Sequence, residues 1–214
     1  MPLCLNSGKL SKAVIVIWKA GRNMVKVHLT GDSLMARHET ADQAMVTVKL
    51  FDLDLSLDIY NSAISGNTTR DLLARYDDII GDTVSEYLFV LVGTNDAAND
   101  RNISIAEFEN NLNQLIAIFE SRYAQPKIHF LLPPPVDESK QFKRTNQKID
   151  AYGLVIEKVC LEKGCKVLNL NQAFRKAASP TQPLEDILKG IKDDGLHFGE
   201  KGYEILARTI YQAL

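Results

Sequence analysis

Short runs of β-favouring apolar residues alternate along the chain with segments in which apolar residues recur at helical spacing. Residues 87–92 (YLFVLV) are continuously apolar, which is typical of a strand that helices cover on both faces. Residues 51–60 alternate apolar side chains with Asp and Ser, which predicts a partly exposed edge strand. The five predicted strands cover residues 25–29, 51–60, 87–92, 128–132 and 167–170.

Four longer segments have the pattern of amphipathic helices. Residues 69–80 form the first, and the second begins at Ser104, for which the spacing to Glu107 predicts a capping box. Residues 146–162 carry one apolar stripe and are followed by Gly164, a typical C-cap residue. The last helix is predicted over residues 200–213.

This alternation of strands and helices predicts parallel βαβ units and therefore a three-layer α/β/α sandwich with a five-stranded parallel sheet. Ligands of such sheets bind at the carboxyl ends of the strands. The residues that carry chemistry are therefore expected in the loops that follow the strands.

Length and composition are those of one globular domain: 214 residues, 45% apolar and 24% charged. We predict a single domain over residues 24–214, preceded by an extension, residues 1–23, whose structure the pattern does not define. The apolar run at residues 13–18 is too short for a signal peptide and lacks a small-x-small cleavage site, which favours a cytoplasmic location. No apolar run approaches the ~20 residues that span a bilayer.

Charge and cysteine content argue against several other classes. The chain has 25 basic and 27 acidic residues and a formal net charge of −2, whereas a dedicated nucleic-acid-binding protein carries a basic face. Three cysteines do not make a disulfide framework, and Cys160 and Cys165 lack the paired spacing of a zinc site.

Three polar motifs follow predicted strands. Residues 31–34 (GDSL) follow the first strand and contain Ser33, and a serine at a strand-to-helix turn is exposed at the end of the sheet. Gly66 lies after the second strand, where the lack of a side chain lets a backbone N–H approach a ligand. Asn95, after the third strand, offers an amide donor suited to an oxyanion hole.

A fourth motif lies before the last helix, where Asp194 and His197 are three residues apart. This spacing in a turn can bring a carboxylate to one imidazole nitrogen and leave the other nitrogen facing outward. Each motif alone also has an ordinary explanation as a helix cap, a turn or a surface hydrogen bond. Their conjunction at the strand ends predicts a catalytic site.

In these four motifs the chain resembles the SGNH (GDSL) hydrolases, a family named for Ser, Gly, Asn and His in four sequence blocks. The resemblance spans residue 25 to the carboxyl terminus and implies a flavodoxin-like fold. It implies a serine esterase in which Ser33 is the nucleophile, His197 accepts its proton and Asp194 orients His197. The backbone N–H groups of Ser33 and Gly66 and the side-chain amide of Asn95 would form the oxyanion hole. The implied substrate is a small-molecule ester, hydrolysed without metal or cofactor.

Small departures and neighbouring features accompany this resemblance. Ala63 stands where the family often has glycine. Residues 133–135, three prolines after the fourth strand, resemble the proline-bearing loop of small family esterases and are expected to stiffen one wall of the cleft. His38 is expected on the first helix, one turn beyond the site.

The remaining titratable groups near the motifs have ordinary interpretations. His28 and His129 lie within predicted strands and are expected to be structural or surface residues. Asp32 and Asp96 are expected to accept hydrogen bonds from backbone groups near their motifs instead of acting as bases.

Two other functions are compatible with the same fold. One is a non-catalytic module that binds carbohydrate or another ligand at the strand ends. The other is a phosphate cradle at residues 30–33, which lacks the glycine pattern and the lysine of a P-loop. Within the hydrolase interpretation, thioesters and lysophospholipids remain alternative substrates. The short loops predict an open cleft for small acyl groups.

Overall fold

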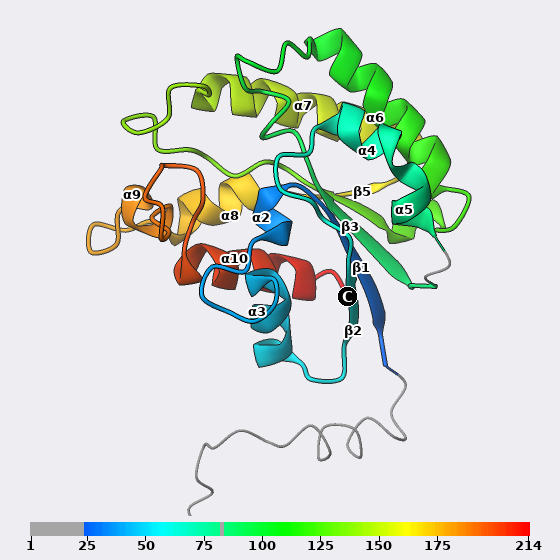
Figure 1. Cartoon of the computed structure of the whole chain (residues 1–214), viewed down its shortest axis with the longest axis horizontal. Helices are drawn as coiled ribbons and strands as arrows, with labels where there is room; N and C mark the ends of the chain where they lie inside the picture. Colours follow the sequence, from blue (N-terminus) through cyan, green and yellow to red (C-terminus); the bar gives the residue numbers. More distant parts are fainter. Residues whose placement is uncertain (1–23, 82–83) are drawn as a thin grey trace, which may run out of the picture.

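The computed structural model describes residues 24–81 and 84–214, in which a five-stranded parallel sheet lies between two layers of helices (Figure 1). The strand order is β2-β1-β3-β4-β5, so that β3 is central. The predicted three-layer sandwich is confirmed, whereas the extension predicted over residues 1–23 lies outside the described residues. The strands are β1 (Lys26–Gly31), β2 (Asp58–Asn61), β3 (Tyr87–Leu91), β4 (Ile128–Leu131) and β5 (Lys166–Leu168).

The central strand β3 contributes to the hydrophobic cores on both faces of the sheet. Its side chains alternate, so that Leu88 and Val90 belong to one core while Phe89 and Leu91 belong to the other. All four side chains are fully buried, which explains why this strand reads as a continuous apolar run.

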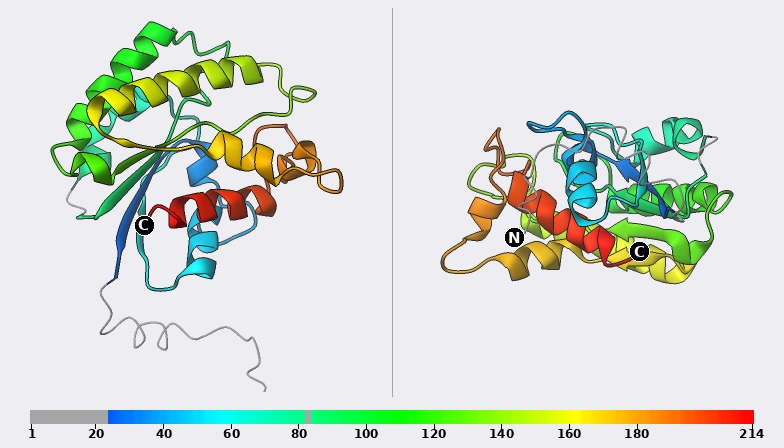
Figure 2. Two further views of the ribbon diagram at one scale, coloured as in Figure 1. Left: turned by 180° about the vertical axis from the view of Figure 1, so that it is seen from behind. Right: turned by 90° about the horizontal axis from the view of Figure 1, so that it is seen from below.

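The helices divide between these two cores. Helices α4 to α7 pack with Leu88 and Val90, and α2, α3, α8, α9 and α10 pack on the opposite face (Figures 1 and 2). No helix in the described part of the chain is long and apolar enough to cross a membrane. The bounds are α2 (Ser33–Ala36), α3 (Met45–Leu53), α4 (Thr69–Ala74), α5 (Tyr76–Ile80), α6 (Ile105–Phe119), α7 (Asn146–Lys163), α8 (Leu170–Ala177), α9 (Leu184–Ile187) and α10 (Glu200–Tyr211).

The strand predicted over residues 51–60 is wrong in its first part. Residues 51–53 end helix α3, and strand β2 begins only at Asp58. Helix α3 buries Met45, Val46 and Leu50, so that a helical stripe beginning upstream prevails over the short alternation that follows it. β2 lies at the edge of the sheet, as expected. The fifth strand is also shorter than predicted, because Leu170 already begins α8.

Helix ends agree with the sequence only in part. The helix predicted over residues 69–80 is two helices that meet at Arg75. Ser104 caps α6 by accepting a hydrogen bond from the Glu107 N–H, but the Glu107 carboxylate pairs with Arg70 and the reciprocal half of the predicted capping box is not formed. Gly164 ends α7 in the left-handed conformation, as predicted.

Candidate active site

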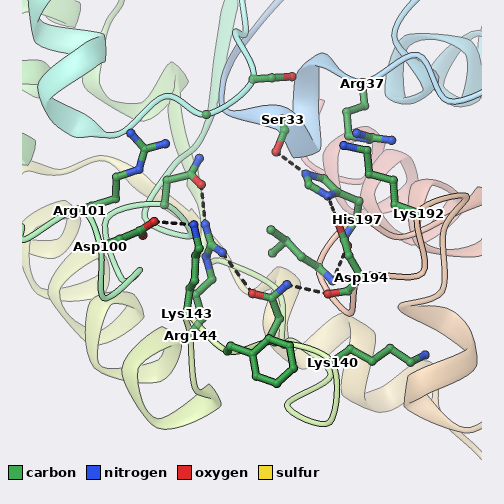
Figure 3. Close-up of a pocket in the computed structure, with 16 residues that line it drawn as sticks. Ser33, Arg37, Asp100, Arg101, Lys140, Lys143, Arg144, Lys192, Asp194 and His197 are labelled. Atoms are coloured by element: carbon green, nitrogen blue, oxygen red, sulfur yellow. Dashed lines mark hydrogen bonds and ion pairs between the residues drawn. The ribbon is translucent and has the colours of Figure 1, made fainter.

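The predicted functional residues meet at the carboxyl edge of the sheet. Ser33 follows β1, Gly66 follows β2 and Asn95 follows β3, while Asp194 and His197 lie in the loop that enters α10. All five line one cavity of about 510 Å³ (Figure 3). The location agrees with the rule that parallel α/β sheets bind ligands at the ends of their strands.

Ser33 is the first residue of the short helix α2, and Asp32 caps this helix by accepting a hydrogen bond from Leu34 N–H at 2.9 Å. The preceding Gly31 has a φ of 137°, and a Cβ there would lie 2.0 Å from the Leu91 carbonyl oxygen of the neighbouring strand. Only glycine allows this close approach of β1 and β3. The turn therefore fixes the position of the serine at the sheet edge.

Ser33, His197 and Asp194 form a continuous hydrogen-bonded chain (Figure 3). Ser33 Oγ lies 2.9 Å from His197 Nε2, and His197 Nδ1 lies 2.7 Å from Asp194 Oδ2. Because a carboxylate only accepts, the imidazole proton belongs on Nδ1 and leaves Nε2 free to accept from the serine hydroxyl. Asp194 Oδ1 also accepts from the backbone N–H groups of Leu196 and His197, which fixes the carboxylate.

Opposing influences set the charge state of this chain. Burial lowers the pKa of His197, and the hydrogen bond and negative charge of Asp194 act in the opposite direction without reversing the shift. The positive charges of Arg37 and Lys192 lower this pKa further. His197 is therefore mainly neutral at pH 7, the form that can accept a proton from serine.

Three donors at the site are free to bind an oxyanion. The backbone N–H groups of Ser33 and Gly66 donate no hydrogen bond to any described residue. Asn95 Nδ2 donates one of its two hydrogens to the Asn67 carbonyl oxygen at 3.0 Å, which leaves the other available to the cavity. Gly66 adopts a φ of 87°, a conformation that favours glycine.

Arg144 holds the Asn95 amide in place, a role that sequence reasoning missed. Its Nη2 donates to Asn95 Oδ1 at 2.7 Å, and its Nε donates to the Thr94 carbonyl oxygen at 2.6 Å. Because arginine only donates, the Asn95 oxygen must face Arg144 and the NH₂ group must face the other way. Arg144 is 49 residues from Asn95 in the chain, and no spacing in the sequence indicates their contact.

Most of the residues that line the cavity have polar or charged side chains. Leu196 and Phe142 are the apolar side chains among the described residues that line it, and Phe142 is 89% exposed. The other lining residues, beyond those already placed, are Arg37, Ser65, Asp100, Arg101, Lys140, Gln141, Lys143, Arg144 and Lys192. In the described part of the chain, no group of three or more His, Cys, Asp or Glu side chains is arranged to hold a metal ion.

Two expectations about the cleft wall need correction. His38 lies beyond the end of α2 instead of on it, and it lines a separate cavity with Ala63. Residues 133–135 are buried and do not line the cavity of Ser33, because Pro133 packs beside Gly93. Residues 140–144, further along the same loop, form that wall instead.

The remaining titratable residues have structural contacts. His28 is fully buried between Tyr123 Oη at 2.8 Å and Ser62 Oγ at 2.7 Å, and burial lowers its pKa to about 4. His129 is also buried, within β4.

The two aspartates of the motifs accept hydrogen bonds from the backbone, as expected. Asp96 accepts from Thr69 N–H at 2.9 Å, and Asp32 caps α2. Complete burial raises the pKa of Asp32 to about 7.

Comparison with known proteins identifies one family of ester hydrolases. Residues 29–205 match the model of the GDSL-like lipase/acylhydrolase family. An acetylxylan esterase of Geobacillus stearothermophilus is 23% identical over 75% of this chain and 74% of its own length. The isoamyl acetate-hydrolyzing esterase of Saccharomyces cerevisiae is 27% identical over 70% of this chain and 65% of its own length.

Solved structures show the same fold. A lipase/acylhydrolase from Enterococcus faecalis superposes with a TM-score of 0.75 and 28% identity, covering 88% of this chain and 94% of that one. The acetylxylan esterase Axe2 of Geobacillus stearothermophilus superposes with a TM-score of 0.72 and 20% identity, covering 88% of this chain and 93% of that one. The chain therefore belongs to the GDSL-like lipase/acylhydrolase family and is a carboxylic ester hydrolase.

Proposed function

We propose that the protein hydrolyses esters of short acyl groups through a Ser33-His197-Asp194 triad and an acyl-enzyme. The observation that carries this proposal is the hydrogen-bonded chain from Ser33 Oγ to Asp194, placed in an open cavity that is lined mostly by residues with polar or charged side chains. His197 Nε2 accepts the serine proton as Oγ attacks the ester carbonyl, and the imidazolium then protonates the leaving alcohol. Water attacks the acyl-enzyme in the second half of the reaction, with His197 again as base.

The charge that develops on the carbonyl oxygen is stabilised by the three free donors. The Ser33 and Gly66 N–H groups and the Asn95 amide are fixed before substrate binds, so that little reorganisation is needed in the transition state. Arg144 is a positioning residue that acts through Asn95.

The preference for short acyl groups follows from the lining of the cavity. A long acyl chain needs apolar walls to gain the ~0.8 kcal/mol per buried CH₂ group, and Leu196 and Phe142 supply few such contacts. Two relatives, the acetylxylan esterase and the isoamyl acetate-hydrolyzing esterase, are named for substrates that carry an acetyl group, which also favours a short acyl group here.

We expect kcat/KM to be highest between acetate and hexanoate in a series of p-nitrophenyl esters from acetate to palmitate, measured below their solubility limits. Each CH₂ group beyond the end of the pocket adds little binding energy. A steady rise to the longest chains, or a jump in rate at micelle formation, would contradict the short-acyl preference.

The rate is expected to rise with pH through one ionisation and then reach a plateau. Protonated His197 cannot accept the serine proton. Because burial lowers the pKa of His197, the pH at which kcat/KM reaches half of its plateau lies below about 6.5. A pH-stat assay between about pH 5 and 8 measures this profile. Burial raises the pKa of Asp32 to about 7, within the same pH range, so Asp32→Asn, which retains a helix-capping side chain, is the matched control. A midpoint that disappears in this variant would assign the ionisation to Asp32 instead of His197.

A further inference from the structure

Basic side chains outnumber acidic ones on the wall of the cavity that contains Ser33, although the whole chain has a net charge of −2. The only acidic side chains among the described residues that line it are Asp100 and Asp194. Figure 3 shows the cations distributed around the site. They are Arg37, Arg101, Lys140, Lys143, Arg144 and Lys192.

Three of these cations are neutralised by ion pairs, so that they leave little net charge facing the cavity. Each has a carboxylate oxygen within hydrogen-bond distance of its charged nitrogen. The pairs are Arg37 with Glu39 at 2.5 Å, Lys140 with Asp193 at 2.6 Å and Lys143 with Asp100 at 2.5 Å.

The other cations are not neutralised in this way. Arg144 is buried, and its guanidinium bonds neutral oxygens, including that of Asn95. Arg101 and Lys192 are exposed, and their side chains make no ion pair or hydrogen bond with any described residue. Because His197 is mainly neutral, Asp194 keeps its negative charge, and the charge of Asp100 acts on Arg101 as well as on Lys143. One carboxylate therefore stands against the charges of Arg101, Arg144 and Lys192, and the described wall of the cavity stays net positive.

The two unpaired cations lie on opposite sides of Ser33 (Figure 3). An Arg101 guanidinium nitrogen would lie 3.7 Å from a Cβ at Gly66, which places it beside the oxyanion donors. Lys192 lies on the side of His197, where its charge acts on the imidazole. The leaving alcohol must also lie on that side, because His197 protonates it.

An exposed cation usually serves only to keep a surface solvated. Here the unpaired positive charge is concentrated at the reactive serine of a chain that is negative overall. A cleft lined by one sign of charge focuses its field and raises the local concentration of ligands of opposite charge.

We propose that the cavity selects short-chain esters whose alcohol part carries a carboxylate or phosphate group. Lys192 binds this group on the side of the leaving alcohol, and the charge of Arg101 adds to the positive field of the cavity from the other side of Ser33. The inference rests on the proposed function, since the same Ser33 hydrolyses the ester. With a short acyl group, the alcohol part occupies most of the cavity and brings its anion to the charged wall. Arg101 and Lys192 are thus specificity-determining residues that the motifs of the sequence do not indicate.

The test compares 4-acetoxybenzoate with its methyl ester, which differ in the negative charge on the alcohol part. The measured quantity is the ratio of kcat/KM for the anionic ester to kcat/KM for the neutral one. We expect Lys192→Gln to lower this ratio about fivefold, Arg101→Gln to lower it about twofold because its charge is farther from the alcohol part, and the double variant to lower it about tenfold, the range for charge interactions near a surface. 4-Acetoxyphenyl phosphate should show the same trend.

Two further variants control for the charge and for the fold. Arg101→Lys keeps the charge, and its ratio should stay close to that of the unmodified protein. Arg122→Gln removes an exposed arginine that does not line the cavity, and it should leave the ratio as in the unmodified protein. Raising the salt concentration from about 0.01 M to about 1 M shortens the Debye length from about 30 Å to about 3 Å and should lower the ratio in the unmodified protein only.

The failures of the inference and of the proposed function are distinguishable. If the double variant has an unchanged ratio, because kcat/KM is the same as before or falls equally for both substrates, the anion preference is overturned. This holds even where release of acetate from the neutral substrate depends on Ser33. If the Ser33→Ala variant still releases acetate from the neutral substrate, the proposed function itself is overturned.

Discussion

Replacing Ser33 with alanine is expected to lower kcat for ester hydrolysis by roughly 10⁴-fold or more. The variant keeps the oxyanion donors but has no nucleophile for His197 to activate, so that only residual catalysis by those donors remains. The substitution removes one hydroxyl at the edge of the cavity, and the fold should stay intact by circular dichroism and thermal unfolding. Activity on p-nitrophenyl acetate measures the loss.

A fluorophosphonate probe provides an independent readout of the nucleophile. Mass spectrometry of the treated protein should show one adduct, on Ser33. Ser65 is the matched control, because it lines the same cavity while His197 bonds Ser33. The Ser65→Ala variant should still be labelled at Ser33, whereas an adduct on Ser65 or a fully active Ser33→Ala variant would rule out the assignment.

The Asn95→Ala variant is expected to lose roughly 10²- to 10³-fold in kcat with little change in KM. Its amide is proposed to donate to the oxyanion, a charge that is complete only in the transition state, so that substrate binding is affected far less than the chemical step. Steady-state kinetics on a short-chain ester separates the two constants. A variant with raised KM and unchanged kcat would make Asn95 a substrate-binding residue instead.

Arg144 tests whether the orientation of Asn95 matters as well as its presence. Arg144→Lys keeps a cation but cannot bond both Thr94 O and Asn95 Oδ1, and we expect kcat to fall roughly tenfold at similar KM. In the Asn95→Ala background the same substitution should have almost no further effect, because residues that act through one another are not additive. Additive losses would show that Arg144 acts independently of Asn95.

Much of the fold was predictable because its signals are local. A continuous apolar run identified β3, and Gly164 marked the end of α7. One failure was also local in origin: the alternation of residues 51–60 extends from the end of helix α3 through a loop into β2, and a short window does not separate the two patterns. Another came from tertiary contact. Glu107 was expected to complete a capping box, but Arg70 on another helix competes for its carboxylate.

The sequence by itself determined the alternation of strands and helices and the residue types at the strand ends, because strand and helix periods and glycine turns depend on neighbours a few positions away. Tertiary structure decided which of those residues meet. Ser33 and His197 are 164 positions apart, and only the sheet topology brings their side chains to 2.9 Å. Tertiary structure also placed Arg144 against Asn95 and left Arg101 and Lys192 at the cavity without an ion pair to any residue that the structure describes. Charge counted along the chain is nearly balanced, whereas charge counted around a cavity depends on which segments line it.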